Sequence, residues 1–362
     1  MKFKLDWTAI APFAALLILG LAAVVPNAWI LGLGAIALAA AVFAAVHHAE
    51  VVAHRVGEPF GTLVLAVAVT VIEVALIVSV MVTGGPEKAG LPRDTVFAAI
   101  MIVCTGIVGI CLLVGGWRHH EQSFQAQGVN ATLAVLCALS VLTMILPDFT
   151  STIPGPVLSP SQLVFVGTIS LVLYMVFVFV QTVRHRDYFL PPVAVLLPGH
   201  VEDDVHAPLP TMGYAMASGG LLLLSLLAVV GLAKLLSPAV EAGVAKAGAP
   251  EAVVGVVIAA LVLLPEGVAA LRAARLNRLQ TSLNLALGSA LASIGLTIPT
   301  VAAVSLVIGQ PIALGLGSKE IVLLLLTLLV STITLGTGRS TVLQGVVHLV
   351  IFATFLFLSV VP

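Results

Sequence analysis

The stretch Leu261-Val262-Leu263-Leu264-Pro265-Glu266-Gly267 places one glutamate inside a run of apolar residues, and Val69-Thr70-Val71-Ile72-Glu73 does the same earlier in the chain. Each acid lies in a segment long enough to span a bilayer, where a charged side chain costs about 2.5–3.5 kcal/mol on an insertion scale. Two such acids indicate a membrane site for cations or protons. The alternative is a pair of neutral, hydrogen-bonded acids that only stabilise a helix bundle.

The composition is that of a membrane protein. Of the 362 residues, 60% are hydrophobic and 9% are charged, and the mean hydropathy is +1.21. Apolar runs of spanning length recur along the chain, which predicts an all-α polytopic membrane protein in contact with lipid. The basic residues are scattered singly rather than gathered in a patch, so nucleic-acid binding has no support, and no cofactor is expected.

Pro, Gly and charged residues divide the chain into about 11 predicted transmembrane helices. Their expected ranges are 8–25, 28–47, 59–83, 95–116, 128–147, 160–183, 212–236, 251–271, 280–309, 320–336 and 340–361. The ninth contains Gly288, Gly295 and Pro299, and it is the candidate for a helix break that lines a cavity.

The basic residues predict the orientation of these helices. With a cytoplasmic N-terminus, the inner ends carry Lys2, Lys4, Arg55, Arg118, Arg184, Arg186, Arg272, Arg275, Arg278 and Arg339. The outer ends carry only Lys88, Arg93, Lys234, Lys246 and Lys319. This bias follows the positive-inside rule and predicts a multi-pass membrane protein with a cytoplasmic N-terminus and an outer C-terminus.

A polar connection, 184–211, contains the acidic cluster Glu202-Asp203-Asp204 and is expected to be a cytoplasmic linker. It separates residues 28–183 from 212–362, with an extra helix at 1–27. Each block has five predicted helices, so the second block enters the membrane from the opposite side. Glu73 and Glu266 both fall in the second helix of their block, which predicts an inverted-repeat transporter with a site at the midplane.

Several motifs resemble those of the CAX-type calcium/cation–proton antiporters, closest to the bacterial branch of Ca2+ or Na+(K+)/H+ antiporters. The first signature is Glu50-Val-Val-Ala-His-Arg-Val-Gly-Glu58-Pro-Phe-Gly61 leading to Glu73, followed by Gly115-Gly-Trp-Arg-His-His-Glu-Gln122-Ser-Phe124. The second is Pro265-Glu-Gly267 with Asn284-Leu-Ala-Leu-Gly288-Ser289; Gly309-Gln-Pro311, Glu320 and Gly338-Arg-Ser-Thr-Val-Leu-Gln344-Gly345 fit the closing helices. The resemblance covers about residues 45 to 360.

The resemblance implies two inverted five-helix repeats preceded by an extra helix 1, and alternating access around one cation site. It implies that Glu73 and Glu266 are the central carboxylates that bind the cation or protons. By the same resemblance, Gly288 and Ser289 supply a backbone turn and a hydroxyl, and Thr105 is the corresponding hydroxyl in the first repeat. It also places Glu50 and Glu58 on the cytoplasmic approach, and it implies a location in the bacterial cytoplasmic (inner) membrane.

The chain departs from the family pattern around both acids. Thr70 and Leu263 replace two asparagines, Ala292 stands where a glutamine is common, and Lys234 stands where an acid is frequent. Calcium takes 6–8 oxygen ligands, so hydroxyls such as that of Thr70, carbonyls or water must complete the site, or the ion is sodium. Pro265 frees a carbonyl one turn earlier, and we expect that carbonyl to be a ligand.

Exchange of Ca2+ for H+ is the leading hypothesis, with Na+(K+)/H+ antiport as the alternative. A cation channel would also place acids in a pore. An intramembrane metalloprotease using His47, His48, Glu50 and His54 is a further rival, but no HExxH motif supports an enzyme. His348 is expected to be a packed or hydrogen-bonded histidine, and a homo-oligomer is left open.

Overall fold

The computed structural model describes residues 6–25, 27–57, 60–84, 88–191, 209–250 and 252–361. Nearly all of them are helical. The first half contains α1 (Trp7–Val24), α2 (Ala28–Val56), α3 (Phe60–Gly84), α4 (Leu91–Met101), η2 (Ile102–Ile107), α5 (Val108–His119), β1 (Gln122–Ser123), α6 (Ala126–Ser140), η3 (Val141–Ile145), η4 (Leu146–Phe149), α7 (Pro160–Phe179), η5 (Val180–Arg184) and η6 (Arg186–Phe189). The second contains α9 (Met212–Lys246), α10 (Ala252–Arg275), α11 (Leu279–Ala292), η8 (Ser293–Thr297), α12 (Ile298–Ile308), α13 (Ser318–Leu335), β2 (Arg339–Ser340) and α14 (Val342–Val360).

The prediction of an all-α membrane protein with 11 transmembrane helices is confirmed for the described residues. Ten helical segments are long and apolar enough to span a bilayer, and α3 is the eleventh helix. Several helices extend beyond their predicted ranges: α2 has 29 residues and α9 has 35. The predicted range 28–47 ended at the polar residue His47, and 212–236 ended shortly after Lys234, but a helix can continue into the interface, where water satisfies its polar side chains.

The predicted break in the ninth helix is wrong, because α11, η8 and α12 form one continuous helical segment, Leu279–Ile308. Its irregularity is η8, a π-helical turn, which adds a residue to one turn without interrupting the helix. The corresponding segment of the first half, Leu91–His119, contains the π-helical turn η2. Gly295 serves packing, since a Cβ there would lie 2.8 Å from Tyr174.

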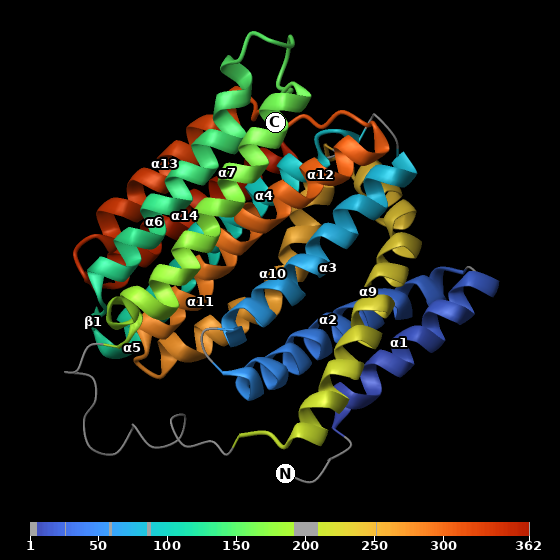
Figure 1. Ribbon diagram of the computed structural model, residues 1–362, viewed down its shortest axis with the longest axis horizontal. Helices are drawn as coiled ribbons and strands as arrows, with labels where there is room; N and C mark the ends of the chain where they lie inside the picture. Colours follow the sequence, from blue (N-terminus) through green and yellow to red (C-terminus); the bar gives the residue numbers. More distant parts are fainter. Residues whose placement is uncertain are drawn as a thin grey trace.

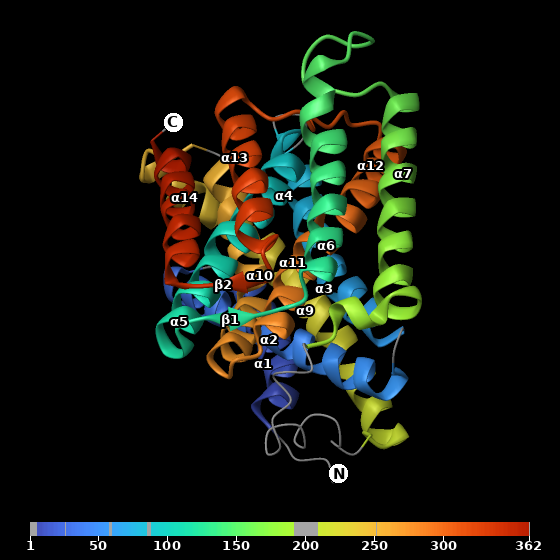
Figure 2. The same cartoon turned by 90° about the vertical axis from the view of Figure 1, so that its left-hand side faces the viewer.

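The helices form two groups, with α3 and α10 between them. Figure 1 shows α1, α2 and α9 obliquely at one side of the molecule, while Figure 2 shows α6, α7, α13 and α14 as upright helices on another. The hydrophobic interior is divided accordingly into two main clusters, and both α3 and α10 contribute buried side chains to each. The two acids therefore lie on the helices at which the two groups meet.

At one end of the bundle, β1 pairs with β2 in an antiparallel arrangement, with Gln122 opposite Ser340. This pairing joins the connection between α5 and α6 to that between α13 and α14 (Figure 2). Gly116 allows the approach, since a Cβ there would lie 2.6 Å from the backbone nitrogen of Val342. The two sequence motifs that contain these strands therefore build one end of the bundle.

At the opposite end, the connection between α12 and α13 is bonded to three other parts of the chain. Ala313 N donates to Ala89 O at 3.0 Å, and Leu314 N donates to Pro156 O at 3.0 Å. Arg93 Nη1 donates to Gly315 O, also at 3.0 Å. These bonds tie the helix ends together on this side.

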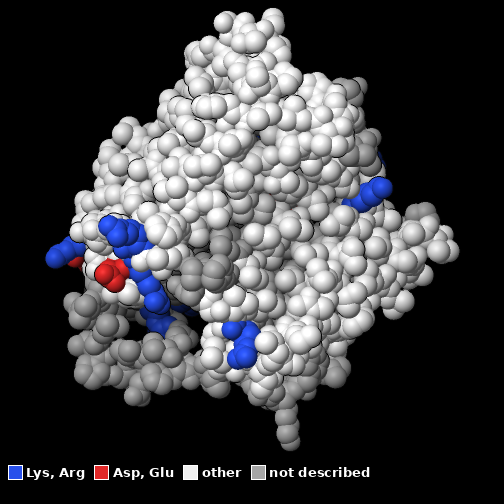
Figure 3. All heavy atoms as spheres, in the orientation of Figure 1, with Lys and Arg blue, Asp and Glu red and all other residues white. Residues whose placement is uncertain are grey.

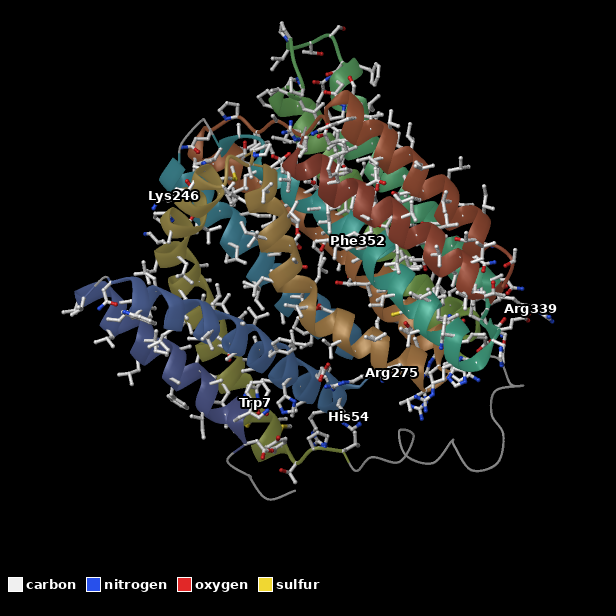
Figure 4. The ribbon with its side chains drawn as sticks, turned by 180° about the vertical axis from the view of Figure 1, so that it is seen from behind. Trp7, His54, Lys246, Arg275, Arg339 and Phe352 are labelled. Atoms are coloured by element: carbon white, nitrogen blue, oxygen red, sulfur yellow. The ribbon has the colours of Figure 1, made fainter. Side chains whose placement is uncertain are left out.

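On the face drawn in Figure 3, charged side chains lie near the margins of a broad uncharged surface. Figure 4 shows Arg275, Arg339 and His54 toward the end that carries β1 and β2, and Lys246 toward the other. The orientation in the membrane and the repeat boundaries stay predictions. Glu58 and the acidic cluster Glu202-Asp203-Asp204 lie outside the described residues.

Candidate functional site

Glu73 lies in the middle of α3 with only 2% of its surface exposed. The Thr297 hydroxyl donates a hydrogen bond to Glu73 Oε2 at 3.0 Å, and the Ser293 side chain is also hydrogen-bonded to this carboxyl group. Glu73 Oε1 is buried and has no hydrogen-bond partner among the described residues. The π-helical turn η8 therefore holds one side of the Glu73 carboxyl group and leaves the other oxygen unsatisfied.

Glu266 lies on α10 with 8% of its surface exposed, and it faces a cavity of about 140 Å3. The cavity lies between α10, α11 and the α7–η5 segment, and its polar lining includes Ser289, Asn284 and Gln181. Glu266 Oε2 and Ser289 Oγ are buried without hydrogen-bond partners among the described residues. Gly288 also lines the cavity, and a Cβ there would meet no atom within 4 Å. The structure thus brings together Glu266, Gly288 and Ser289, as the sequence predicted.

The two acids belong to one region but do not have the same surroundings. The Glu266 carboxyl group lies within electrostatic range of those of Glu73 and Glu50. Val69, one turn before Glu73 on α3, lines the cavity, whereas Glu73 itself does not. Two carboxyl groups at low dielectric can hold a cation or protons, but the empty, doubly charged form is costly.

Two amide side chains near Glu266 were missed from the sequence. Asn284 Nδ2 donates to Phe189 O at 2.7 Å, and Asn284 Oδ1 accepts from Gln280 Nε2 at 3.0 Å. Gln181, on η5, lines the same cavity. The expectation that amide oxygens are scarce around the acids therefore needs correction. They come from η5 and α11 rather than from the positions of Thr70 and Leu263.

Other predicted site residues lie apart from the cavity in this conformation. The Thr105 hydroxyl, on η2, donates to the carbonyl of Met101 one turn earlier in its own helix. Thr70 is buried on α3 but does not line the cavity. The expected carbonyl ligand is not found there either, because α10 continues through Pro265 and Leu261 is not part of the cavity wall.

The histidines near the end of α2 do not form a metal centre. His48 Nε2 lies 3.1 Å from Thr8 O, and the His47 and His48 rings meet edge to face. In the part of the chain that the structure describes, no three His, Cys, Asp or Glu side chains are grouped to hold a metal ion. Glu50 is exposed at the same end of α2, within electrostatic range of Glu266.

Comparison with known proteins gives consistent matches over nearly the whole chain. The family model described as sodium/calcium exchanger protein matches residues 26–183 and 217–361. A putative ionic transporter, y4hA, of Sinorhizobium fredii is 53% identical over 325 residues, covering 90% of this chain and 87% of that protein. The sodium-potassium/proton antiporter ChaA of Escherichia coli is 35% identical over 324 residues, with the same coverage.

The fold is also found among solved structures. The structure of native YfkE superposes with a TM-score of 0.75 at 16% identity, covering 98% of this chain and 100% of that one. At this identity the likeness shows the fold alone. Together with the relatives and the family model, it confirms the resemblance that the sequence motifs indicated. The chain belongs to the sodium/calcium exchanger protein family, whose members are membrane transporters that exchange cations.

Proposed function

We propose that this protein is a Ca2+/H+ antiporter that works by alternating access, with Glu73 and Glu266 as the shared binding site for cation and protons. The observation that carries the proposal is the pair of buried carboxyl groups on α3 and α10. Each has an oxygen without a partner among the described residues, Oε1 of Glu73 and Oε2 of Glu266. Such oxygens are costly in an apolar interior unless a proton or a cation occupies them.

Competition for these oxygens explains how the transport of the cation is coupled to the transport of protons. A cation that enters from one side displaces protons from the carboxyl groups, and protons that enter from the other side displace the cation. The empty, doubly charged site is the least stable state in the interior, so it is the state that crosses least readily between the two faces. Exchange follows, because one of the two cargoes has to be bound when the protein changes conformation.

Calcium is the cargo that the oxygen donors favour. Two carboxylates match its double charge, and Ca2+ takes 6–8 oxygen ligands. The hydroxyl of Ser289 and the amides of Gln181 and Asn284 lie in the cavity with Glu266. Thr297 and Ser293 lie against Glu73. These neutral groups, together with water in a cavity of about 140 Å3, supply the remaining ligands.

We assign the conformation to the inward-facing state. The cavity lining runs from Tyr174 to Gln181 along α7 and η5, and from Ala292 back to Asn284 along α11. Both directions lead toward the bundle end with the basic residues predicted to be cytoplasmic. At the other end, Ala313, Leu314 and Arg93 hold the connections together through hydrogen bonds. This assignment rests on the predicted orientation, with the N-terminus in the cytoplasm.

A Na+(K+)/H+ antiporter is the second candidate, and one observation favours it. The relative ChaA, named a sodium-potassium/proton antiporter, is 35% identical over 90% of this chain. The site does not exclude a monovalent ion, because Glu266 and the neutral oxygens around it suit Na+ if Glu73 keeps a proton. The two candidates therefore share one site and one mechanism and differ in cargo.

The test is cation exchange in proteoliposomes with an imposed pH gradient, measured in turn with Ca2+, Na+ and K+. We expect Ca2+ uptake that depends on the gradient and collapses when a protonophore removes it. Gradient-driven Na+ or K+ exchange without Ca2+ exchange would establish the second candidate. Cation flux that ignores the pH gradient would indicate a channel and would refute antiport.

A further inference from the structure

His348 is a buried titratable side chain to which the proposed exchange gives no role. It lies on α14, and none of its surface is exposed. Its Nδ1 atom lies 2.7 Å from the carbonyl oxygen of Cys104, inside the π-helical turn η2. Its Nε2 atom lies 2.8 Å from the Thr334 hydroxyl on α13. One imidazole therefore connects three helical segments in the interior.

The chemistry of the partners fixes which nitrogen carries hydrogen. A carbonyl oxygen only accepts hydrogen bonds, so His348 Nδ1 must donate to Cys104 O. A threonine hydroxyl can donate or accept, so the Thr334 hydroxyl can donate to Nε2 when Nδ1 carries the hydrogen. The bond to η2 is thus the one that requires an N–H donor at the position of Nδ1.

Glycines bring α14 close enough for this bond. A Cβ on Gly109 would lie 3.0 Å from the Cβ of His348, and a Cβ on Gly106 would lie 3.1 Å from the ring of Phe352, which is labelled in Figure 4. A Cβ on Gly345 would overlap the backbone nitrogen of Leu113. These close contacts between α14 and the η2–α5 segment, here called the seam, include His348.

The opposite side of η2 contacts α10 next to Glu266. The Ile107 side chain lies against Gly267, where an added Cβ would be 3.2 Å from the Ile107 Cδ1 atom. A π-helical turn adds one residue to a helical turn, so a shift of η2 along the helix would rotate the intervening residues by about 100° around its axis. Such a shift would move Ile107 away from Gly267 and change the packing beside Glu266.

We propose that His348 is a positioning residue that fixes η2 at Ile102–Ile107 through its bond to Cys104 O, and that it thereby sets the geometry of α10 at Glu266. His348 touches neither acid and is not a ligand for the cargo. The part of this inference that concerns Glu266 rests on the proposed function. The part that concerns the anchoring of η2 rests only on the contacts of His348.

Two amide substitutions separate the two contacts of the ring. Asn places its Nδ2 donor where His348 Nδ1 lies, and Gln places its amide where Nε2 lies. His348→Asn should therefore keep the bond to Cys104 O, and His348→Gln should lose it. The original full-length chain and each variant would be purified and reconstituted. Two quantities would be measured for each: hydrogen–deuterium exchange of the amides of residues 102–108, and the Ca2+ concentration at which transport is half-saturated.

We expect His348→Gln to raise both the amide exchange rate of η2 and the half-saturating Ca2+ concentration about tenfold, the effect of one buried hydrogen bond. The maximal rate should change less, by about twofold, because the affinity for cargo is affected rather than the crossing step. His348→Asn should behave like the original chain, and amides of η8 should not change in either variant. A defect in His348→Asn as large as in His348→Gln would overturn the proposal, as would unchanged η2 amides in His348→Gln.

A second variant tests the seam without altering the histidine. Gly109→Ala should push α14 away and accelerate amide exchange in η2, whereas Gly20→Ala on α1, where a Cβ meets nothing within 4 Å, should not. Equal rates of amide exchange in η2 for the two glycine variants would count against the proposal. If the original chain shows no exchange of any cation, the proposed function fails, but the amide measurements still decide whether His348 anchors η2.

Discussion

The surroundings of Glu73 and Glu266 differ, although the sequence predicts that the two acids occupy equivalent places in two repeats. Glu73 is held by the hydroxyl of Thr297 and by Ser293, both on a π-helical turn. Glu266 faces a cavity, and its neighbours there are Ser289 and the amides of Gln181 and Asn284. One acid is therefore hydrogen-bonded by protein groups in this conformation, and the other lines a cavity.

The function proposed above requires both acids to bind the same cargo. Cargo that enters the cavity beside Glu266 therefore also has to reach Glu73, which does not line the cavity in this conformation. The hydrogen bonds from Thr297 and Ser293 to Glu73 are the feature that distinguishes the two acids at this step. The predictions below test how far the two acids depend on each other.

The largest effect is expected from removing either charge. Glu73→Gln and Glu266→Gln should each reduce pH-driven exchange at least about 100-fold, because the amide resembles the protonated acid and cannot release a proton. Folding should be retained, as checked by size-exclusion profiles and thermal unfolding. Coupled transport that survives in both variants would show that the site lies elsewhere.

A smaller effect is expected when Glu73 loses its hydroxyl partner. Thr297→Val removes the hydrogen bond to Glu73 Oε2 while keeping the shape of the side chain, so exchange should fall about tenfold. Thr300→Val is the matched control, since the Thr300 hydroxyl donates to Leu296 O in its own helix and the side chain is exposed. Transport rates across a range of Ca2+ concentrations would check this. Equal rates for the two variants would mean that Glu73 does not need η8.

The amide near Glu266 should influence the choice of ion more than the rate. Gln181→Leu removes a neutral oxygen from the cavity, so the half-saturating concentration should rise about fivefold for Ca2+ and less for Na+, because Ca2+ needs more oxygen ligands. Gln127→Leu, on an exposed position of α6, is the control. An equal shift for the two ions would count against a ligand role for Gln181.

Much of the fold and half of the site could be predicted from the sequence. The spanning lengths and the position of Glu266 in an apolar helix follow from composition and pattern, and the pair Gly288 and Ser289 came from the family resemblance. The approach of Thr297 and Ser293 to Glu73 could not be predicted, because it depends on how η8 packs against α3, 224 residues away for the Thr297 bond. A threonine in an apolar helix usually bonds to its own backbone, as Thr300 does, so no local signal distinguishes the two.

The amides were missed for a related reason. Gln181 lies outside the quoted motifs, and only the packing of α7 and η5 against α10 and α11 brings it to the cavity. Asn284 belongs to the second quoted motif, but no site role was predicted for it. The predicted helix break failed because Gly295 and Pro299 were interpreted as interruptions. Gly295 instead lets Tyr174 pack against the helix, and the helix continues through Pro299, which lies just after the π-helical turn η8.

The smallest effect is expected from a substitution of Thr105. Its comparison with Thr297→Val tests the two π-helical turns against each other. Thr105 on η2 and Thr297 on η8 are both fully buried, but the Thr105 hydroxyl bonds to Met101 O in its own helix rather than to an acid. Thr105→Val should therefore change the exchange rate by less than about twofold, since a bond within one helical turn contributes little. Rates would be measured beside those of Thr297→Val under the same pH gradient. A defect in Thr105→Val as large as in Thr297→Val would contradict this expectation, and it would mean that Thr105 turns toward Glu266 in the opposite-facing state. In that case the two acids would exchange their hydroxyl partners during each transport cycle.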